Sequence, residues 1–364
     1  MTARGGISAF QFFCTVFVCR AIALFTFIIT NKESFPPGDR AVLFAPLALV
    51  GTAAVIPVLL VLGKKEDRTL FALTDRLHPA VSKGAALLYT AGAVWSAGVS
   101  LTRFDLFMST VMFSGAKLWG LILLLAASAV PVALRGRETV ARMSLPVLAL
   151  LAASLVYVGV TVIGEFAPAD LELPLRNGVL PLFRNARSAV ARTGELAALL
   201  VFAPHIRGGV KKGVFLWWLS FGVTGSLLYT LTTGVLGAYG ERQMFQLYAL
   251  TVLSKLGAAE RLDALICAIW VLCSLVRLAF HLIVAGMFLE GGFRVHRGAP
   301  LYCGLALPVL SVYFVLSRSV TVFARVIGSG INDLIFLLLL IAAPLSVLAA
   351  VKIKTHVQAK KGIL

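Results

Sequence analysis

The sequence has few charged residues, and this scarcity excludes most soluble proteins. Asp, Glu, Lys and Arg together make up 13% of its 364 residues, whereas hydrophobic residues make up 59%. An ordinary soluble domain carries about 25% charged residues, enough to cover its surface. Here the mean hydropathy is +0.94, so the apolar segments must face lipid or one another. The composition therefore predicts an all-α polytopic membrane protein embedded in a lipid bilayer.

The chain also lacks the motifs that would indicate an enzyme or a cofactor-binding protein. It contains no P-loop, no dinucleotide-binding glycine motif after a strand, no H-E-x-x-H and no serine nucleophile elbow. Its five cysteines form no C-x-x-C pair and have no histidine at metal-ligand spacing, so we expect them to be small buried apolar side chains. We therefore predict no enzymatic activity, no cofactor and no metal site.

Acidic residues are scarce relative to basic ones. There are 16 Asp and Glu against 33 Lys and Arg, which gives a formal net charge of +17. In a soluble protein this excess would suggest nucleic-acid binding. Here the basic residues recur in short clusters between apolar stretches, which is the pattern of cytoplasmic loops under the positive-inside rule. We therefore predict a membrane protein that does not bind nucleic acid.

Ten apolar segments of about the length of a membrane span follow one another along the chain. They are 7–30, 41–63, 84–113, 117–134, 143–164, 187–205, 213–238, 262–289, 299–317 and 331–351. A shorter piece, Gln243 to Leu256, is a candidate interfacial helix. If the N-terminus is cytoplasmic, 18 Lys and Arg lie on the cytoplasmic side and 11 on the other. This asymmetry predicts that both termini are cytoplasmic.

The longest loop, 165–186, divides these segments into five plus five. An odd number of spans in each half gives the two halves opposite orientations, as an inverted repeat requires. We therefore predict a single transmembrane domain over 1–364. It comprises a first five-helix repeat in 1–164, a second in 187–351, and 165–186 as a connecting extracytoplasmic loop.

Ionised side chains inside the spans are the main functional signal, because an isolated charge at mid-bilayer costs about 2.5–3.5 kcal/mol. Arg20 and Glu195 lie at matched depth in the first and sixth segments, and we predict that they pair. The pair is either purely structural or part of a ligand site, where Arg20 would bind an amino acid's carboxylate and Glu195 its ammonium group. Glu195 is also a candidate proton-coupling group. Arg103 and Arg277 complete the predicted charge network, Arg277 with His281 one turn further along the same helix face.

Several short stretches, in order along the chain, carry a family resemblance. They are Ile7-Ser8-Ala9-Phe10-Gln11, Cys19-Arg20, Arg135-Gly136-Arg137-Glu138-Thr139-Val140-Ala141-Arg142, Thr193-Gly194-Glu195-Leu196, Glu260-Arg261-Leu262-Asp263-Ala264-Leu265 and Ile269-Trp270-Val271-Leu272. Together they resemble the B-subunit permease family of spore germinant receptors, within the amino-acid–polyamine–organocation superfamily. The resemblance covers nearly the whole chain.

The resemblance implies a ten-span LeuT-like 5+5 inverted repeat, in which spans one and six are partly unwound around a central nutrient site. It also implies a location in the spore inner membrane or cell membrane, beside an A-type subunit and a C-type lipoprotein. The ligand would be a small germinant, often an amino acid. The alternative is a proton-coupled amino-acid permease. Taken from the resemblance and from depth in the membrane, the candidate ligand-binding residues are Arg20, Ala21, Ala23, Leu24, Trp95, Gly98, Gly194, Glu195, Leu199 and Cys273.

One stretch departs from the family pattern. The family usually carries glycine in the middle of span one, whereas this chain has Ala21-Ile22-Ala23 there, and 7–30 contains neither glycine nor proline. The resemblance therefore predicts a break in span one that the local sequence does not favour.

Overall fold

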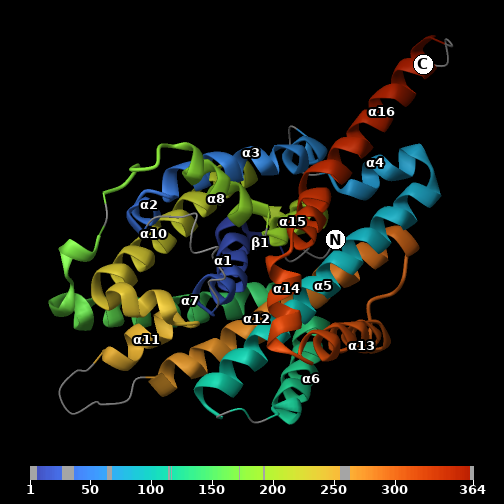
Figure 1. The fold of residues 1–364 in the computed structure, drawn as a ribbon. Helices are drawn as coiled ribbons and strands as arrows, with labels where there is room; N and C mark the ends of the chain where they lie inside the picture. The colour runs from blue at the N-terminus through green and yellow to red at the C-terminus, as the bar shows by residue number, and fades with distance from the viewer. Residues whose placement is uncertain are drawn as a thin grey trace.

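The structure is a computed structural model that describes residues 6–26, 37–63, 68–113, 115, 117–171, 173–191, 193–254 and 263–360. Most of these residues are helical, and the helices form one bundle (Figure 1). This confirms an all-α polytopic architecture.

The first half of the chain forms a short strand and eight α-helices. They are β1 (Ile7–Ser8), α1 (Ala9–Thr26), α2 (Pro37–Ala41), α3 (Phe44–Leu62), α4 (Leu70–Leu77), α5 (Pro79–Val111), α6 (Trp119–Arg135), α7 (Arg137–Val162) and α8 (Leu180–Ala191). Two short 3-10 helices, η1 (Ile163–Glu165) and η2 (Pro168–Asp170), follow α7.

The second half begins with irregular helix and continues with long helices. Its elements are η3 (Gly194–Ala198), α9 (Leu199–Phe202), η4 (Ala203–His205), β2 (Ile206–Arg207), α10 (Val210–Arg242), α11 (Gln246–Leu253), α12 (Asp263–Phe293), α13 (Ala299–Leu316), α14 (Val320–Gly328), α15 (Gly330–Leu337), η5 (Leu338–Ala342) and α16 (Ala343–Lys360). Here η3 and η4 are 3-10 helices and η5 is a π-helix.

Among the described residues, seven helices are long and apolar enough to cross a membrane. They are Phe44–Leu62, Pro79–Val111, Arg137–Glu165, Val210–Gly240, Ala264–Phe293, Ala299–Leu316 and Asp333–Lys360. Three shorter apolar helices, Ala9–Ala21, Trp119–Arg135 and Gly194–His205, fall in the other predicted segments. Each predicted segment thus contains apolar helix, while ten complete crossings and the LeuT-like repeat stay predictions.

Helix α12 lies at the centre of the bundle and packs against α1, α5, α6 and α7 (Figure 1). Of its most apolar stretch 78% is buried, against 28% for α13. A helix that is apolar around its whole circumference is expected in such an interior position. The polar side chains in the middle of α12, Ser274, Arg277 and His281, are therefore buried among other helices.

A short parallel strand pair joins the start of α1 to the end of the sixth segment. Ile7 pairs with Ile206 and Ser8 with Arg207. The N-terminus of α1 is closed by a capping box, in which the Ser8 amide donates to Gln11 Oε1 at 2.9 Å and the Gln11 amide to Ser8 Oγ at 3.1 Å. Because residue 7 begins one segment and residue 206 ends the other, the first and sixth segments run in opposite directions.

The sixth segment is broken, whereas the first is not. Helix α8 starts at Leu180, inside the predicted loop 165–186, and ends at Ala191 before the break. Thr193 leaves the helical region at φ −111° and ψ 66°, and a 3-10 helix begins at Gly194. By contrast, α1 is continuous from Ala9 to Thr26. Within the described residues, the break implied for span six is present and the one implied for span one is absent, in line with the lack of glycine there.

Two other boundaries differ from the hydropathy pattern. The piece around 243–256 does form a short helix, α11, although its position relative to a membrane surface stays a prediction. Helix α16 continues to Lys360, past the expected end at 351, and extends beyond the bundle (Figure 1). Lys354 Nζ on this extension donates to the carbonyl oxygen of Leu77 at 3.1 Å, which ties it to the C-terminus of α4.

The close approach of α3 and α10 depends on a glycine. A Cβ atom added to Gly51 would lie 2.3 Å from the indole ring of Trp218, which is fully buried. We therefore expect Gly51→Ala to lower the free energy of unfolding by about 1–3 kcal/mol through overpacking. Thermal unfolding of the detergent-solubilised protein measures this. Gly84→Ala on α5 is the control, since no atom lies within 4 Å of its added Cβ and alanine favours the helix. Equal effects of the two substitutions would contradict this packing.

Candidate functional site

A buried ion pair lies between the broken sixth segment and α12. Arg277 Nη2 lies 2.9 Å from Glu195 Oε1, and the two side chains are 5% and 1% exposed. Charged residues are almost never this deeply buried unless they are paired. The negative charge of the Glu195 carboxylate is thus compensated by Arg277 on α12, which lies within hydrogen-bond distance.

Arg277 connects three parts of the chain. Besides Glu195, its Nη1 donates to the main-chain carbonyl oxygen of Cys19 on α1. Its own carbonyl oxygen lies 2.8 Å from His281 Nδ1, one turn further along α12. A guanidinium group presents several donors in a fixed plane, which suits it to such simultaneous contacts. Arg277 is therefore a central residue of the site.

Arg20 belongs to the same charge cluster. It is buried on α1, next to Cys19, and its guanidinium carbon lies 6.0 Å from the centre of the Phe221 ring on α10. The positive charges of Arg277 and Arg20 both act on the Glu195 carboxylate. A direct hydrogen bond or ion pair between the side chains of Arg20 and Glu195 stays a prediction.

Local backbone geometry explains why Glu195 reaches this position. It follows Gly194, where an added Cβ atom would lie 2.4 Å from the Phe336 ring of α15. Only glycine allows the chain to pass so close to that ring. The 3-10 helix that follows has three residues per turn, which puts Glu195 and Ala198 on the same face, and both line the adjoining cavity.

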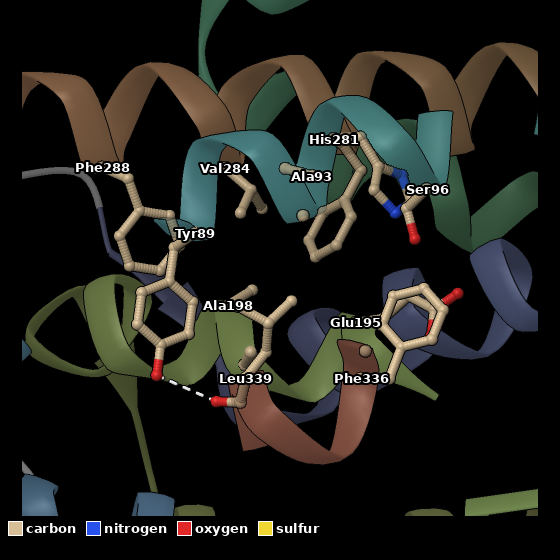
Figure 2. A pocket seen from close by; sticks show the side chains of 14 residues that line it. Tyr89, Ala93, Ser96, Glu195, Ala198, His281, Val284, Phe288, Phe336 and Leu339 are labelled. Carbon is tan, nitrogen blue, oxygen red and sulfur yellow. Dashed lines mark hydrogen bonds between the residues drawn. The ribbon is translucent and has the colours of Figure 1, made fainter. Parts of the chain in front are cut away.

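This cavity is enclosed by four parts of the bundle (Figure 2). The lining residues are Tyr89, Gly92, Ala93 and Ser96 of α5; Gly194, Glu195, Ala197 and Ala198 of η3; Phe280, His281, Val284 and Phe288 of α12; and Phe336 and Leu339 of α15 and η5. Its free volume is about 20 Å³, enough for one or two water molecules. Sites for small organic ligands typically measure about 300–1,000 Å³, so the cavity is closed in this conformation.

The cavity has a polar end and an aromatic end. Figure 2 shows Glu195, His281 and Ser96 at one end, and Tyr89 and Phe288 at the other. The rings of Tyr89 and Phe288 stack at 4.7 Å with an interplanar angle of 11°. Apart from its polar end the lining is largely apolar, so the arrangement suits a ligand with one charged group and an apolar remainder.

The tenth segment closes the cavity with an irregular helix. Phe336 and Leu339 form this wall, and the turn around Leu339 is a π-helix. Tyr89 Oη donates a hydrogen bond to the Leu339 carbonyl oxygen at 2.9 Å (Figure 2). Short π-helical stretches often lie at functional sites. A ligand larger than water would have to displace this wall, because Phe336 lies directly on Gly194.

Of the predicted ligand-binding residues, the structure brings Gly194 and Glu195 to the cavity. Trp95 and Gly98 do not line it, although they lie on the same helix as Ser96. A Cβ atom on Gly98 would be 2.4 Å from Val312 of α13, and Trp95 packs on the same side, in a separate apolar cluster that includes Val99. Their prediction used depth alone, and neighbouring positions on a helix differ in direction by about 100°.

The remaining predicted residues surround the ion pair or lie further away. Ala21, Leu199 and Cys273 are buried in the core but do not line the cavity. The side chains of Ala23 and Leu24 lie outside the described ones. Arg103 is half-buried about 10 Å further along α5 than Ser96. A ligand-binding role for any of these residues stays a prediction.

Sequence reasoning missed the α5 side of the cavity. Gly92, Ala93, Ser96, Ala97 and Ser100 are buried on α5, which packs closely against α12. A stripe of small residues at helical spacing is a known signature of close approach between membrane helices. This stripe, read from the sequence, would have indicated that Ser96 faces a neighbouring helix. No comparable signal marks Leu339, because its neighbours in the sequence are also apolar.

The family described as "Spore germination protein", a spore permease family, matches residues 6–315 of the chain. A comparison with curated proteins finds no match. The matched region contains β1, α1, the sixth segment and α12, and therefore includes both partners of the ion pair and all of the cavity wall except Phe336 and Leu339. With most of its length matched, the chain belongs to the spore permease family of spore germination proteins.

Proposed function

We propose that this protein is the membrane subunit of a spore nutrient germinant receptor. It binds a small germinant, most simply an amino acid, in the central cavity and signals germination from there. It acts together with A-type and C-type receptor subunits in the spore inner membrane. The family membership supports a transporter-like membrane protein of germination, and the site supports the ligand class.

The observation that carries the proposal is the second oxygen of Glu195. Oε1 pairs with Arg277, whereas Oε2 is buried and accepts no hydrogen bond from the part of the chain that the structure describes. A buried carboxylate oxygen without a donor costs free energy. Because Glu195 lines the cavity, the ammonium group of a ligand would supply the missing donor.

The rest of the cavity suits a small apolar group. Ala93, Val284 and Leu339 contribute its wall, and none carries a side-chain hydrogen-bonding group. A ligand would therefore direct its ammonium group to Glu195 and its side chain away from it. Since the cavity holds only one or two waters, binding requires η5 to move outward. This movement would couple occupancy of the cavity to the position of the tenth segment, which is what a receptor needs.

The alternative is a proton-coupled amino-acid permease. His281 and Glu195 lie at the same end of the cavity (Figure 2), and two neighbouring titratable groups are a common arrangement for carrying a proton. The two functions share one ligand class but differ in outcome. When a receptor binds the ligand, it alters the activity of its partner subunits. A permease instead releases the ligand on the other side of the membrane.

Spores test the two functions directly. We expect spores that lack this chain to lose germination with at least one member of a panel of amino acids, and the wild-type chain to restore it. Glu195→Gln should not restore it, because the amide carries no charge for the ligand's ammonium group. Glu138→Gln is the control, since Glu138 forms an exposed pair with Arg142. Normal germination without the chain, with amino-acid uptake by proteoliposomes containing it alone, would favour the permease.

The buried pair also makes a stability prediction. Arg277→Leu and Glu195→Leu should each lower the free energy of unfolding by about 3–5 kcal/mol, since each leaves a buried charge without its hydrogen-bonded partner. The double substitution should be less destabilising than either single one. The exposed pair Glu138–Arg142 provides the matched control, because surface pairs contribute about 0–1 kcal/mol. Thermal unfolding of the wild type, the two single variants and the double variant decides this. Additive losses at the buried pair would contradict a direct interaction.

A further inference from the structure

A second, larger pocket lies at the ends of α5, α6 and α13. It is open, its volume is about 510 Å³, and it shares no lining residue with the central cavity. This volume falls within the usual range for small-molecule sites of about 300–1,000 Å³. By size alone, this pocket accommodates an organic ligand, whereas the closed central cavity does not.

The pocket faces the opposite end of the bundle from the β1–β2 pair. The last turns of α12 meet the first turns of α5, where an added Cβ on Gly292 would lie 2.3 Å from Ala86. Ile7 of β1 and Ile283 of α12 line a common cavity towards that same end. Asp105 lies near the other end of α5. In the predicted orientation, the pocket therefore opens on the extracytoplasmic side.

A carboxylate forms one side of this pocket. Asp105 Oδ2 accepts a hydrogen bond of 3.1 Å from the hydroxyl of Tyr313, which is fully buried on α13. Oδ1 is buried and accepts no hydrogen bond from any described residue. Tyr313 thus fixes the direction of the carboxylate, and Asp105 lines the pocket with one of its two oxygens not hydrogen-bonded by any described residue.

Two basic side chains and two aromatic rings also line this pocket. Lys117 and Arg318 line the pocket and are exposed. The Lys117 ammonium lies 5.4 Å from the centre of the Trp119 ring, and Trp119 packs edge-on against Phe314 at 6.1 Å. The pocket thus combines a negative group held by Tyr313, two exposed positive groups and an apolar wall.

A lysine and a tryptophan at the end of a span are also typical of the interfacial belt of membrane proteins. That explanation accounts for Lys117 and Trp119 but not for Asp105. A half-buried carboxylate that a buried tyrosine holds in place has no role in anchoring a helix at the membrane surface.

We propose that this pocket is a second ligand site that binds a zwitterion, namely a free amino acid with a large apolar side chain. Its ammonium group binds Asp105, its carboxylate binds Lys117 or Arg318, and its side chain packs on Trp119 and Phe314. The site goes beyond the proposed central site and does not depend on it.

Equilibrium binding of radiolabelled L-phenylalanine to the full chain, in nanodiscs of phosphatidylglycerol, tests this. We expect saturable binding that Asp105→Asn weakens by about tenfold or more, since it removes the charge that binds the ammonium group. The double substitution of Lys117→Gln and Arg318→Gln should weaken it by a similar factor, since it removes both candidate partners of the ligand's carboxylate. Asn keeps the acceptor for Tyr313, so that variant should fold. The matched control Arg325→Gln, on an exposed face of α14, should bind like the wild type. Absence of saturable binding, or equal binding by all variants, would overturn the proposal.

Two analogues test the zwitterion itself. Phenethylamine lacks the carboxylate and phenylacetate lacks the ammonium group, so each should compete at least about tenfold more weakly than L-phenylalanine. Phenylacetate competing as well as the amino acid would identify a simple anion site instead. Glu195→Gln should retain this binding, which distinguishes the outer pocket from the central cavity. Loss of the binding in that variant would assign it to the central cavity and overturn the proposal.

A phosphatidylethanolamine headgroup carries the same two charges as a free amino acid. A second set of nanodiscs, in which phosphatidylethanolamine replaces half of the phosphatidylglycerol, distinguishes the lipid headgroup from the free amino acid as the occupant of the pocket. We expect the same dissociation constant for L-phenylalanine in both membranes. A severalfold rise with phosphatidylethanolamine would identify the lipid as the occupant and contradict a free amino-acid site.

Discussion

Glu195 and Arg277 are both almost fully buried, and each charge can stay there only because the other is within hydrogen-bond distance. This requirement restricts the rest of the centre. Arg277 must hold its guanidinium plane between Glu195 and the Cys19 carbonyl oxygen, so α1, η3 and α12 are held in one arrangement. Arg20, whose charge also acts on Glu195, adds a second interaction between the first and sixth segments. A substitution at any of these groups is therefore expected to change the packing of all three elements.

The irregular backbone of the bundle is concentrated around this pair. The 3-10 helix η3 and the π-helix η5 contact each other, and residues of both line the central cavity. Non-helical backbone within a membrane is tolerated only where protein or a cavity shelters it. Here the irregular segments are also the ones that would have to separate to admit a ligand. The contacts that hold this wall of the cavity in place, among them Phe336 on Gly194 and Tyr89 on Leu339, are therefore the ones that the proposed ligand binding would have to break.

Hydropathy was sufficient to locate the apolar segments, and the cost of a buried charge was sufficient to single out Glu195. Neither property specifies the direction in which a side chain points. Arg20 and Arg277 both lie at mid-depth, so the sequence could not show that Arg277 would hydrogen-bond to Glu195. For the same reason, Trp95 was a plausible wall residue whereas its neighbour Ser96 lines the cavity. The π-helical turn lies within a run of leucines, where no local feature distinguishes it from regular helix.

The geometry of the pair requires Glu195 to be ionised and held by Arg277 in the closed protein. Infrared difference spectroscopy between the wild type and Glu195→Gln, in nanodiscs at neutral pH, measures this for one side chain. We expect the two stretching bands of an ionised carboxylate, and we expect Arg277→Leu to shift them or to replace them with the band of a protonated acid. A protonated-acid band already in the wild type, unchanged by Arg277→Leu, would contradict it.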